Sequence, residues 1–215
     1  MRRALGRRYR ALAPDLGAGP WEAEIDRLEA LAPGEHALAG YSMGGRLALA
    51  LALRRPERVR ALVLVSASPG LADAGERAAR RAADAALADR IEAIGVEAFA
   101  REWAAQPLFA GQPAAVAALA HEDRLRRSAA EHAAQLRGLG TGEMPALWDR
   151  LAELAMPVTL VVGERDPKFR AIAARMAERL PDAALLEVPG AGHAVALEAP
   201  EAVAAAIGRT HPAVP

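Results

Sequence analysis

The sequence predicts an α/β protein in which a mostly parallel sheet carries helices on both faces. In residues 1–70 and 151–215, short apolar runs typical of buried strands alternate with segments of helical spacing. Residues 71–150 instead contain alanine, arginine and glutamate at helical spacing. Hydrophobic residues make up 53% of the 215-residue chain, which is enough to bury a large core. We therefore predict one α/β core, residues 1–70 and 151–215, with an all-helical lid at 71–150.

The first elements are a short strand and a helix. Residues 8–12 mix apolar and polar side chains and lead into residues 14–17, Pro-Asp-Leu-Gly, which predicts a strand that ends in a turn. Residues 21–31 carry apolar side chains at helical spacing, and Pro33-Gly34 ends that helix.

Two buried strands then flank a second helix. Residues 36–40 form a short apolar run, and residues 61–66 form a longer one. Between them, residues 46–55 are strong helix formers, and Pro56 ends the helix.

The chain after residue 150 repeats this alternation. Residues 157–163 are a continuous apolar strand, and residues 169–180 have helical spacing. Residues 184–188 are a further strand, and residues 200–207 form a last helix with a proline in its first turn, where proline is tolerated. Chemistry in such sheets sits at the carboxyl ends of the strands.

A serine turn follows the strand at 36–40. Gly40-Tyr-Ser-Met-Gly44 has the G-x-S-x-G pattern between a predicted strand and a predicted helix, the context that this motif requires. We expect only glycine to fit at the two flanks of so tight a turn. The turn holds the hydroxyl of Ser42 above the sheet, at the beginning of a helix, as a candidate nucleophile.

An aspartate and a histidine follow two later strands. Asp166 comes just after the strand at 157–163, and His193 lies in a glycine-rich loop after the strand at 184–188. The order Ser, Asp, His is that of nucleophile-elbow enzymes. We predict a catalytic triad in which His193 takes the proton of Ser42 and Asp166 orients the imidazole.

Several stretches match one subfamily of enzymes with this serine turn, and the match runs from about residue 8 to the end. They are residues 40–46, 68–71 with 76–77, 103 with 106–109, 136–142 with 147–148, 163–169, and 192–193 with 198–201. The serine turn and the Gly-His loop are shared by many hydrolases, whereas residues 103 with 106–109, 136–142 and 166–169 are more particular to this subfamily. On these stretches the chain resembles the 2-succinyl-6-hydroxy-2,4-cyclohexadiene-1-carboxylate synthase family of α/β hydrolases, which acts in menaquinone biosynthesis. The resemblance implies an α/β-hydrolase fold with a helical lid.

The activity that the resemblance implies is a carbon–oxygen lyase reaction. In that family the triad acts as a base on 2-succinyl-5-enolpyruvyl-6-hydroxy-3-cyclohexene-1-carboxylate, and elimination expels pyruvate. The amide of Met43 would be one oxyanion donor. The substrate carries several carboxylates, which guanidinium groups bind in two-point contacts. The positions that match substrate-binding residues of the family are Tyr41, Arg46, Arg80, Trp103 and Arg124.

The sequence departs from the family at its beginning. Family members carry a further N-terminal segment with a central strand and a His-Gly-Phe loop that supplies the second oxyanion amide, and no His-Gly precedes residue 40 here. Three explanations are open: a start codon assigned too far downstream, a fragment, or a rearranged sheet in which residues 8–12 pair directly with the strand at 36–40. The first is preferred. If the chain is complete as written, we expect weak or absent catalysis, since losing one oxyanion donor costs about 10²–10³ in rate.

Two other functions share these residues. A serine carboxylesterase has the same fold and triad, although a pocket for neutral acyl chains would not favour Arg46 one turn after Ser42. A non-catalytic hydrolase-like protein fits the absent oxyanion loop.

Composition limits the partners. The formal net charge is +0, which argues against nucleic-acid and membrane partners. With zero cysteines and no phosphate-binding, dinucleotide or His-rich metal motif, we expect no cofactor and no metal. No run reaches the ~18 apolar residues of a membrane helix, and arginines interrupt any secretory apolar stretch near the N-terminus. We expect a cytoplasmic protein, monomer or homo-oligomer, with a small polycarboxylate substrate.

Overall fold

The computed structural model describes residues 9–211, which divide into two compact units. Of the described residues, 9–15, 28–69 and 147–211 form the first, the sheet unit. Residues 16–27 and 70–146 form the second, the helical unit. Helix α2 (Trp21–Leu31) has residues in both. The grouping of residues 16–27 with the helical unit differs from the division predicted above.

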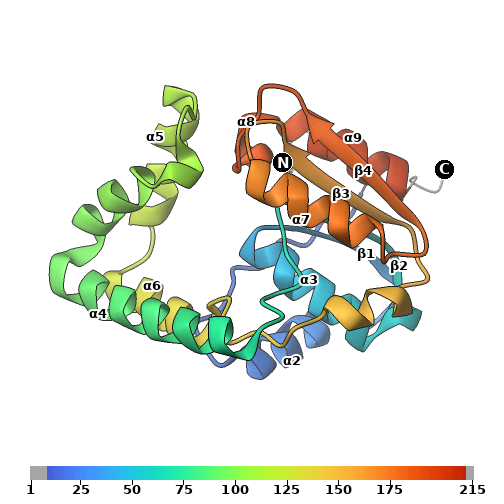
Figure 1. Ribbon diagram of the computed structural model, residues 1–215, viewed down its shortest axis with the longest axis horizontal. Helices are drawn as coiled ribbons and strands as arrows, with labels where there is room; N and C mark the ends of the chain where they lie inside the picture. Colours follow the sequence, from blue (N-terminus) through green and yellow to red (C-terminus); the bar gives the residue numbers. More distant parts are fainter. Residues whose placement is uncertain (1–8, 212–215) are drawn as a thin grey trace. The chain divides into compact units, whose positions relative to one another are not determined.

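The sheet has four parallel strands in chain order. They are β1 (His36–Tyr41), β2 (Val59–Val65), β3 (Val158–Gly163) and β4 (Ala183–Val188). All four agree with the predicted strands within a few residues, and the predicted α/β fold class is confirmed. Because all the strands are parallel, their carboxyl ends lie along one edge of the sheet (Figure 1).

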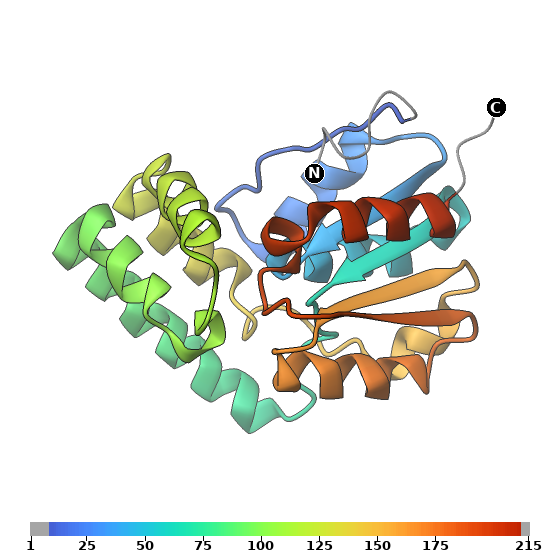
Figure 2. The same cartoon turned by 90° about the horizontal axis from the view of Figure 1, so that it is seen from above.

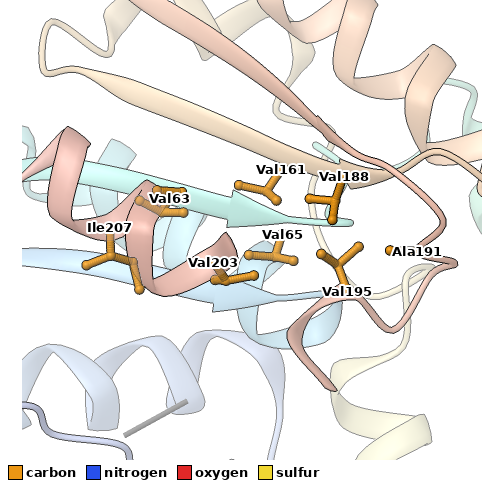
Figure 3. Close-up of a cluster of buried hydrophobic side chains, with 9 residues drawn as sticks. Val63, Val65, Val161, Val188, Ala191, Val195, Val203 and Ile207 are labelled. Atoms are coloured by element: carbon orange, nitrogen blue, oxygen red, sulfur yellow. The ribbon is translucent and has the colours of Figure 1, made fainter. Parts of the chain in front are cut away.

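Alternation along the strands separates two apolar layers. Val63 and Val65 on β2 pack with Val161 on β3 against Val203 and Ile207 (Figure 3). The last two lie on helix α9 (Pro200–Thr210), which covers this face of the sheet. The side chains at the intervening positions of β2 and β3 point to the opposite face. Helix α7 (Pro167–Ala177) covers the face opposite α9 (Figure 2), and the inner strands β2 and β3 are buried almost throughout.

Further helices connect the strands. Helix α3 (Met43–Arg54) joins β1 to β2 through the short helix η1 (Pro56–Arg58), and it packs on both strands. The short helix η3 (Trp148–Glu153) precedes β3, and α8 (Val195–Glu198) precedes α9. Helix α3 begins three residues before the predicted start at Arg46, because the glycines of the serine turn belong to its first turn.

The helical unit is built from α4 (Ala74–Ala104), η2 (Pro107–Phe109), α5 (Ala114–Leu125) and α6 (Ala129–Leu139). Helix α4 bends at Gly95, where φ is 80°. Ser128 caps α6 in a reciprocal pair of hydrogen bonds with Glu131, which satisfies the first backbone N–H groups of that helix. Ile91, Phe99 and Leu136 lie in the apolar core of the helical unit.

The strand predicted at residues 8–12 is not observed. Residue 8 lies outside the described residues, and residues 9–15 form no strand. Leu12 is 62% exposed, so this segment buries too little apolar surface to join a sheet, and Tyr9 instead donates a hydrogen bond to the carbonyl of His211. The rearranged sheet in which these residues pair with β1 is therefore wrong for the described part of the chain. Within that part, β1 is an edge strand.

No helix among the described residues is long and apolar enough to cross a membrane.

Candidate active site

The serine turn places Ser42 between β1 and α3 with a left-handed backbone, φ 49°. A Cβ on Gly40 would lie 2.5 Å from the carbonyl carbon of Gly44 and 2.6 Å from Cα of Gly45. A Cβ on Gly45 would lie 2.5 Å from Cβ of Ala67. Around Gly44, by contrast, no described atom beyond its chain neighbours and the nearby backbone of α3 lies within 4 Å of the Cβ position. The expectation that only glycine fits at both motif flanks is thus wrong for Gly44, and the crowded pair is Gly40 and Gly45.

Asp166 lies three residues beyond β3 and caps the N-terminus of α7. Its Oδ1 accepts a hydrogen bond from the backbone N–H of Phe169 at 3.2 Å, which fixes one side of the carboxylate. The residue is 4% exposed. Its second oxygen, Oδ2, is left to face the histidine loop.

His193 joins the other two residues. Its Nδ1 donates to Oδ2 of Asp166 at 2.7 Å, since an ionised carboxylate can only accept. That tautomer leaves Nε2 as an acceptor, and Oγ of Ser42 lies 3.3 Å from it. The imidazole is buried at 3% exposure. The three residues from three strand ends thus form one hydrogen-bonded chain within the sheet unit.

Two aromatic rings flank the imidazole. The ring centroid of Phe169 lies 4.5 Å from that of His193, and the ring of Tyr41 lies 5.6 Å away. Both rings therefore pack beside the imidazole, which is buried. Tyr41 was predicted from the sequence, whereas Phe169 was given no role. The position of Phe169, three residues after Asp166 and in the first turn of a helix, could have indicated that it lies near the triad.

The loop that carries His193 is held by residues that sequence reasoning did not assign. Glu198 accepts from the backbone N–H of Gly192 at 2.9 Å and pairs with Arg165 at 3.1 Å. A Cβ on Gly163 would collide with the carbonyl oxygens of Ala191 and Gly192, so a glycine at the end of β3 allows this loop to approach. In the sequence, Glu198 stands out only as part of the 198–201 stretch that matches the family, and no role was predicted for it.

The beginning of α3 offers a donor and a cation near Ser42. Met43 is the first residue of α3, and its N–H has no acceptor among the described residues. This N–H belongs to the N-terminus of α3, which is the positive end of the helix dipole. Arg46 follows in the first turn and is 7% exposed. Both therefore sit in the same unit as the Ser42–His193–Asp166 chain.

The other three predicted binding residues lie in the helical unit. Arg80 pairs through Nε with Asp84 at 2.8 Å. The guanidinium of Arg124 lies 5.4 Å from the ring of Phe109, whose centroid is 6.5 Å from that of Trp103. Within this unit Trp103 and Arg124 therefore share one aromatic cluster.

No group of three or more histidine, cysteine, aspartate or glutamate side chains with the arrangement of a metal site occurs in residues 9–211.

Comparisons with known proteins show what this chain is similar to. The model of the alpha/beta hydrolase family matches residues 1–206. A Bacillus subtilis (strain 168) protein named putative 2-succinyl-6-hydroxy-2,4-cyclohexadiene-1-carboxylate synthase is 45% identical over 166 residues, covering 76% of this chain and 61% of that protein. The structure of MenH from S. aureus superposes with a TM-score of 0.86 at 30% identity, covering 91% of this chain and 80% of that one. A thermophilic esterase from Thermogutta terrifontis gives a TM-score of 0.70 at 26% identity, covering 93% and 74%.

The chain spans less than two thirds of the length of the B. subtilis relative.

Proposed function

The chain belongs to the alpha/beta hydrolase family, and we propose that it is a lyase that eliminates pyruvate from 2-succinyl-5-enolpyruvyl-6-hydroxy-3-cyclohexene-1-carboxylate. One observation carries the proposal: Ser42, His193 and Asp166 form a hydrogen-bonded chain in a sequence 45% identical to a protein named as the synthase of the corresponding product. The pyruvate and the cyclohexadiene product together account for the atoms of the substrate.

The arrangement supports base catalysis. Nε2 of His193 takes the proton of Ser42, and Oγ of Ser42 takes a proton from a ring carbon of the substrate. The electron pair left on that carbon forms a new ring double bond, and the C–O bond to the enolpyruvyl group breaks. The released enolpyruvate becomes pyruvate when its methylene carbon takes up a proton. Asp166 stabilises the imidazolium that forms, and the N–H of Met43 stabilises negative charge on the substrate.

We propose that arginines bind the carboxylates of this substrate. Arg46 in the sheet unit, and Arg80 and Arg124 in the helical unit, would each form a charge-assisted two-point contact. Tyr41 and Trp103 would contribute ring surface beside them. For this function we expect no nucleic-acid or membrane partner, since the formal net charge is +0.

A serine carboxylesterase is the second candidate. The likeness to the T. terrifontis esterase favours it, because an esterase needs the same Ser42 nucleophile and histidine base. In that reaction Ser42 forms an acyl intermediate instead of removing a proton from carbon. A third candidate, a non-catalytic relative, keeps the triad geometry without turnover.

The test is pyruvate release from freshly prepared substrate. We expect weak release of pyruvate that Ser42→Ala abolishes and Ser66→Ala preserves. Ser66 is a matched control because it directly follows the adjacent strand β2 with a similar φ of 46°, and its buried hydroxyl has no hydrogen-bond partner in the described structure. Cleavage of a p-nitrophenyl ester without pyruvate release would overturn the lyase in favour of the esterase. Neither product, from a folded protein, would indicate the non-catalytic relative.

A further inference from the structure

The helical unit contains a buried carboxylate that the proposed reaction does not use. Asp84 lies on α4 and is only 4% exposed. Its Oδ1 accepts from Nε of Arg80 at 2.8 Å. Its Oδ2 is buried and has no hydrogen-bond partner in the described part of the chain. The carboxylate therefore faces the protein interior with a single interaction, from Arg80.

Such an arrangement is costly to folding. A buried carboxylate normally satisfies both oxygens, and an apolar side chain at the same place is often at least as stable. Nor does helix stability explain the pair, because the favourable order at i,i+4 places the acid before the base, whereas here Arg80 precedes Asp84. Stability therefore does not explain an aspartate at this position, and we looked for another role for Asp84.

Two glycines bring the end of α6 against this carboxylate. A Cβ on Gly140 would lie 2.5 Å from Oδ2 of Asp84, and one on Gly142 would lie 2.7 Å from the backbone nitrogen of Arg81. The side chain of Arg81 also donates to the carbonyl of Gly142 at 2.8 Å. The Leu-Arg-Gly-Leu-Gly-Thr-Gly stretch at 136–142 thus closes over Asp84 and restricts where its carboxylate can move.

Arg80 meets Asp84 with the side edge of its guanidinium. Only Nε is engaged, and Nη1 and Nη2 have no partner in the described structure, while the side chain is 41% exposed. A guanidinium held in this way keeps its terminal edge, with two parallel N–H donors, for a second carboxylate. An arginine without such an anchor samples many rotamers and loses that freedom on binding.

We propose that Asp84 is a positioning residue that holds Arg80 ready for two-point binding of a substrate carboxylate. This inference rests on the role proposed above for Arg80. The proposal also predicts the direction in which anion binding should change. Removing the charge of Asp84 makes the surroundings of Arg80 more positive, which by itself would strengthen binding of an anion. Weaker binding after that change therefore reports the lost orientation.

The experiment is a double-mutant cycle with Asp84→Asn, Arg80→Ala and the double variant. For the elimination reaction we expect Asp84→Asn to raise KM about tenfold with kcat within about twofold, as expected for lost carboxylate binding. In the Arg80→Ala background the same change should have no further effect. Glu92→Gln is the control, since it removes an exposed carboxylate from Arg137 in the same unit. A lower KM, or an equal rise in both backgrounds, would overturn the proposal.

A second readout separates this inference from the lyase proposal. Binding of tricarballylate, a non-reacting tricarboxylate, is measured by calorimetry for the same four proteins. Weaker binding by Asp84→Asn only when Arg80 is present supports the positioning role even if no pyruvate is released. Absence of binding by the unmodified chain overturns it.

If Asp84→Asn does not fold, an NMR measurement on the unmodified chain still tests the proposal. The Nε–H resonance of Arg80, assigned with Arg80→Lys, should keep its hydrogen-bonded position when tricarballylate is added, while the Nη signals shift. Movement of the Nε–H signal to the position of a free arginine would show that Arg80 leaves Asp84 to bind, and would overturn the proposal.

Discussion

The serine turn allows a paired test of how backbone packing positions Ser42. Gly40→Ala and Gly44→Ala change the two glycines of the same motif in the same way. At Gly40 the new Cβ would meet backbone atoms of Gly44 and Gly45, whereas at Gly44 it would meet no described atom within 4 Å beyond its chain neighbours and the nearby backbone of α3. The two variants should therefore differ strongly, although their sequence positions look equivalent.

The magnitude follows from the distances. The Cβ of Gly40→Ala would lie 2.6 Å from Cα of Gly45, and reaching an ordinary 3.4 Å contact requires a shift of ~0.8 Å in the first turn of α3. Ser42 lies between Gly40 and Gly45 in the chain, and its Oγ is 3.3 Å from Nε2 of His193. A shift of this size moves the two atoms beyond hydrogen-bonding distance. We expect a loss of about 1–3 kcal/mol in the free energy of unfolding. Gly44→Ala should be neutral or stabilise the helix by about 0.5 kcal/mol.

Two assays measure these effects without relying on the natural substrate. Urea unfolding gives the stability of each variant, and the rate of labelling by a fluorophosphonate reports the reactivity of Ser42. Gly40→Ala should label about 10²-fold more slowly, as expected for a misplacement approaching 1 Å. Gly44→Ala should keep the stability of the unmodified chain. Equal stability and labelling in the two variants would refute the packing argument.

Three further changes test other parts of the structure. Asp166→Asn should lower kcat about 10⁴-fold with little change in stability, because it favours the wrong tautomer of His193; a kcat loss below tenfold would contradict that role. Glu24, 3% exposed, has its pKa lowered below 4.5 chiefly by its hydrogen bond from Arg27, so its stabilisation is present at neutral pH and lost as the pH falls through the lowered pKa. In urea unfolding, Glu24→Gln should cost about 1–2 kcal/mol at pH 7 and less at pH 3; an equal cost at both would argue against the ion pair. Ser66→Gly should raise the unfolding free energy by about 1 kcal/mol, because it relieves a left-handed φ of 46° and removes a buried hydroxyl without a partner; a lower melting temperature would contradict this.

Much of the fold was predictable because its signals are local. Helix α2 has the predicted bounds, and β3 begins one residue after the predicted start. Continuous apolar runs are typical of strands that are covered on both faces, and parallel sheets are usually covered in this way. The sequence therefore indicated parallel strands. The strand expected at 8–12 failed because strand formation depends on a pairing partner, which no local pattern specifies. Helix α8 and the bend at Gly95 likewise leave only weak local signals.

The candidate site divides in the same way. The residue types and their order could be read from the sequence alone: a serine in a strand–turn–helix context, then an aspartate and a histidine after later strands. The folded structure was needed to show that Nδ1 of His193 lies 2.7 Å from Oδ2 of Asp166 and that Phe169 packs on the imidazole. Only it showed which glycine the turn requires, and that Asp84 holds Arg80 by one edge. The physical reason is that hydrogen bonds and steric contacts depend on distances of a few ångströms between segments far apart in the chain, which are set by packing of the whole fold.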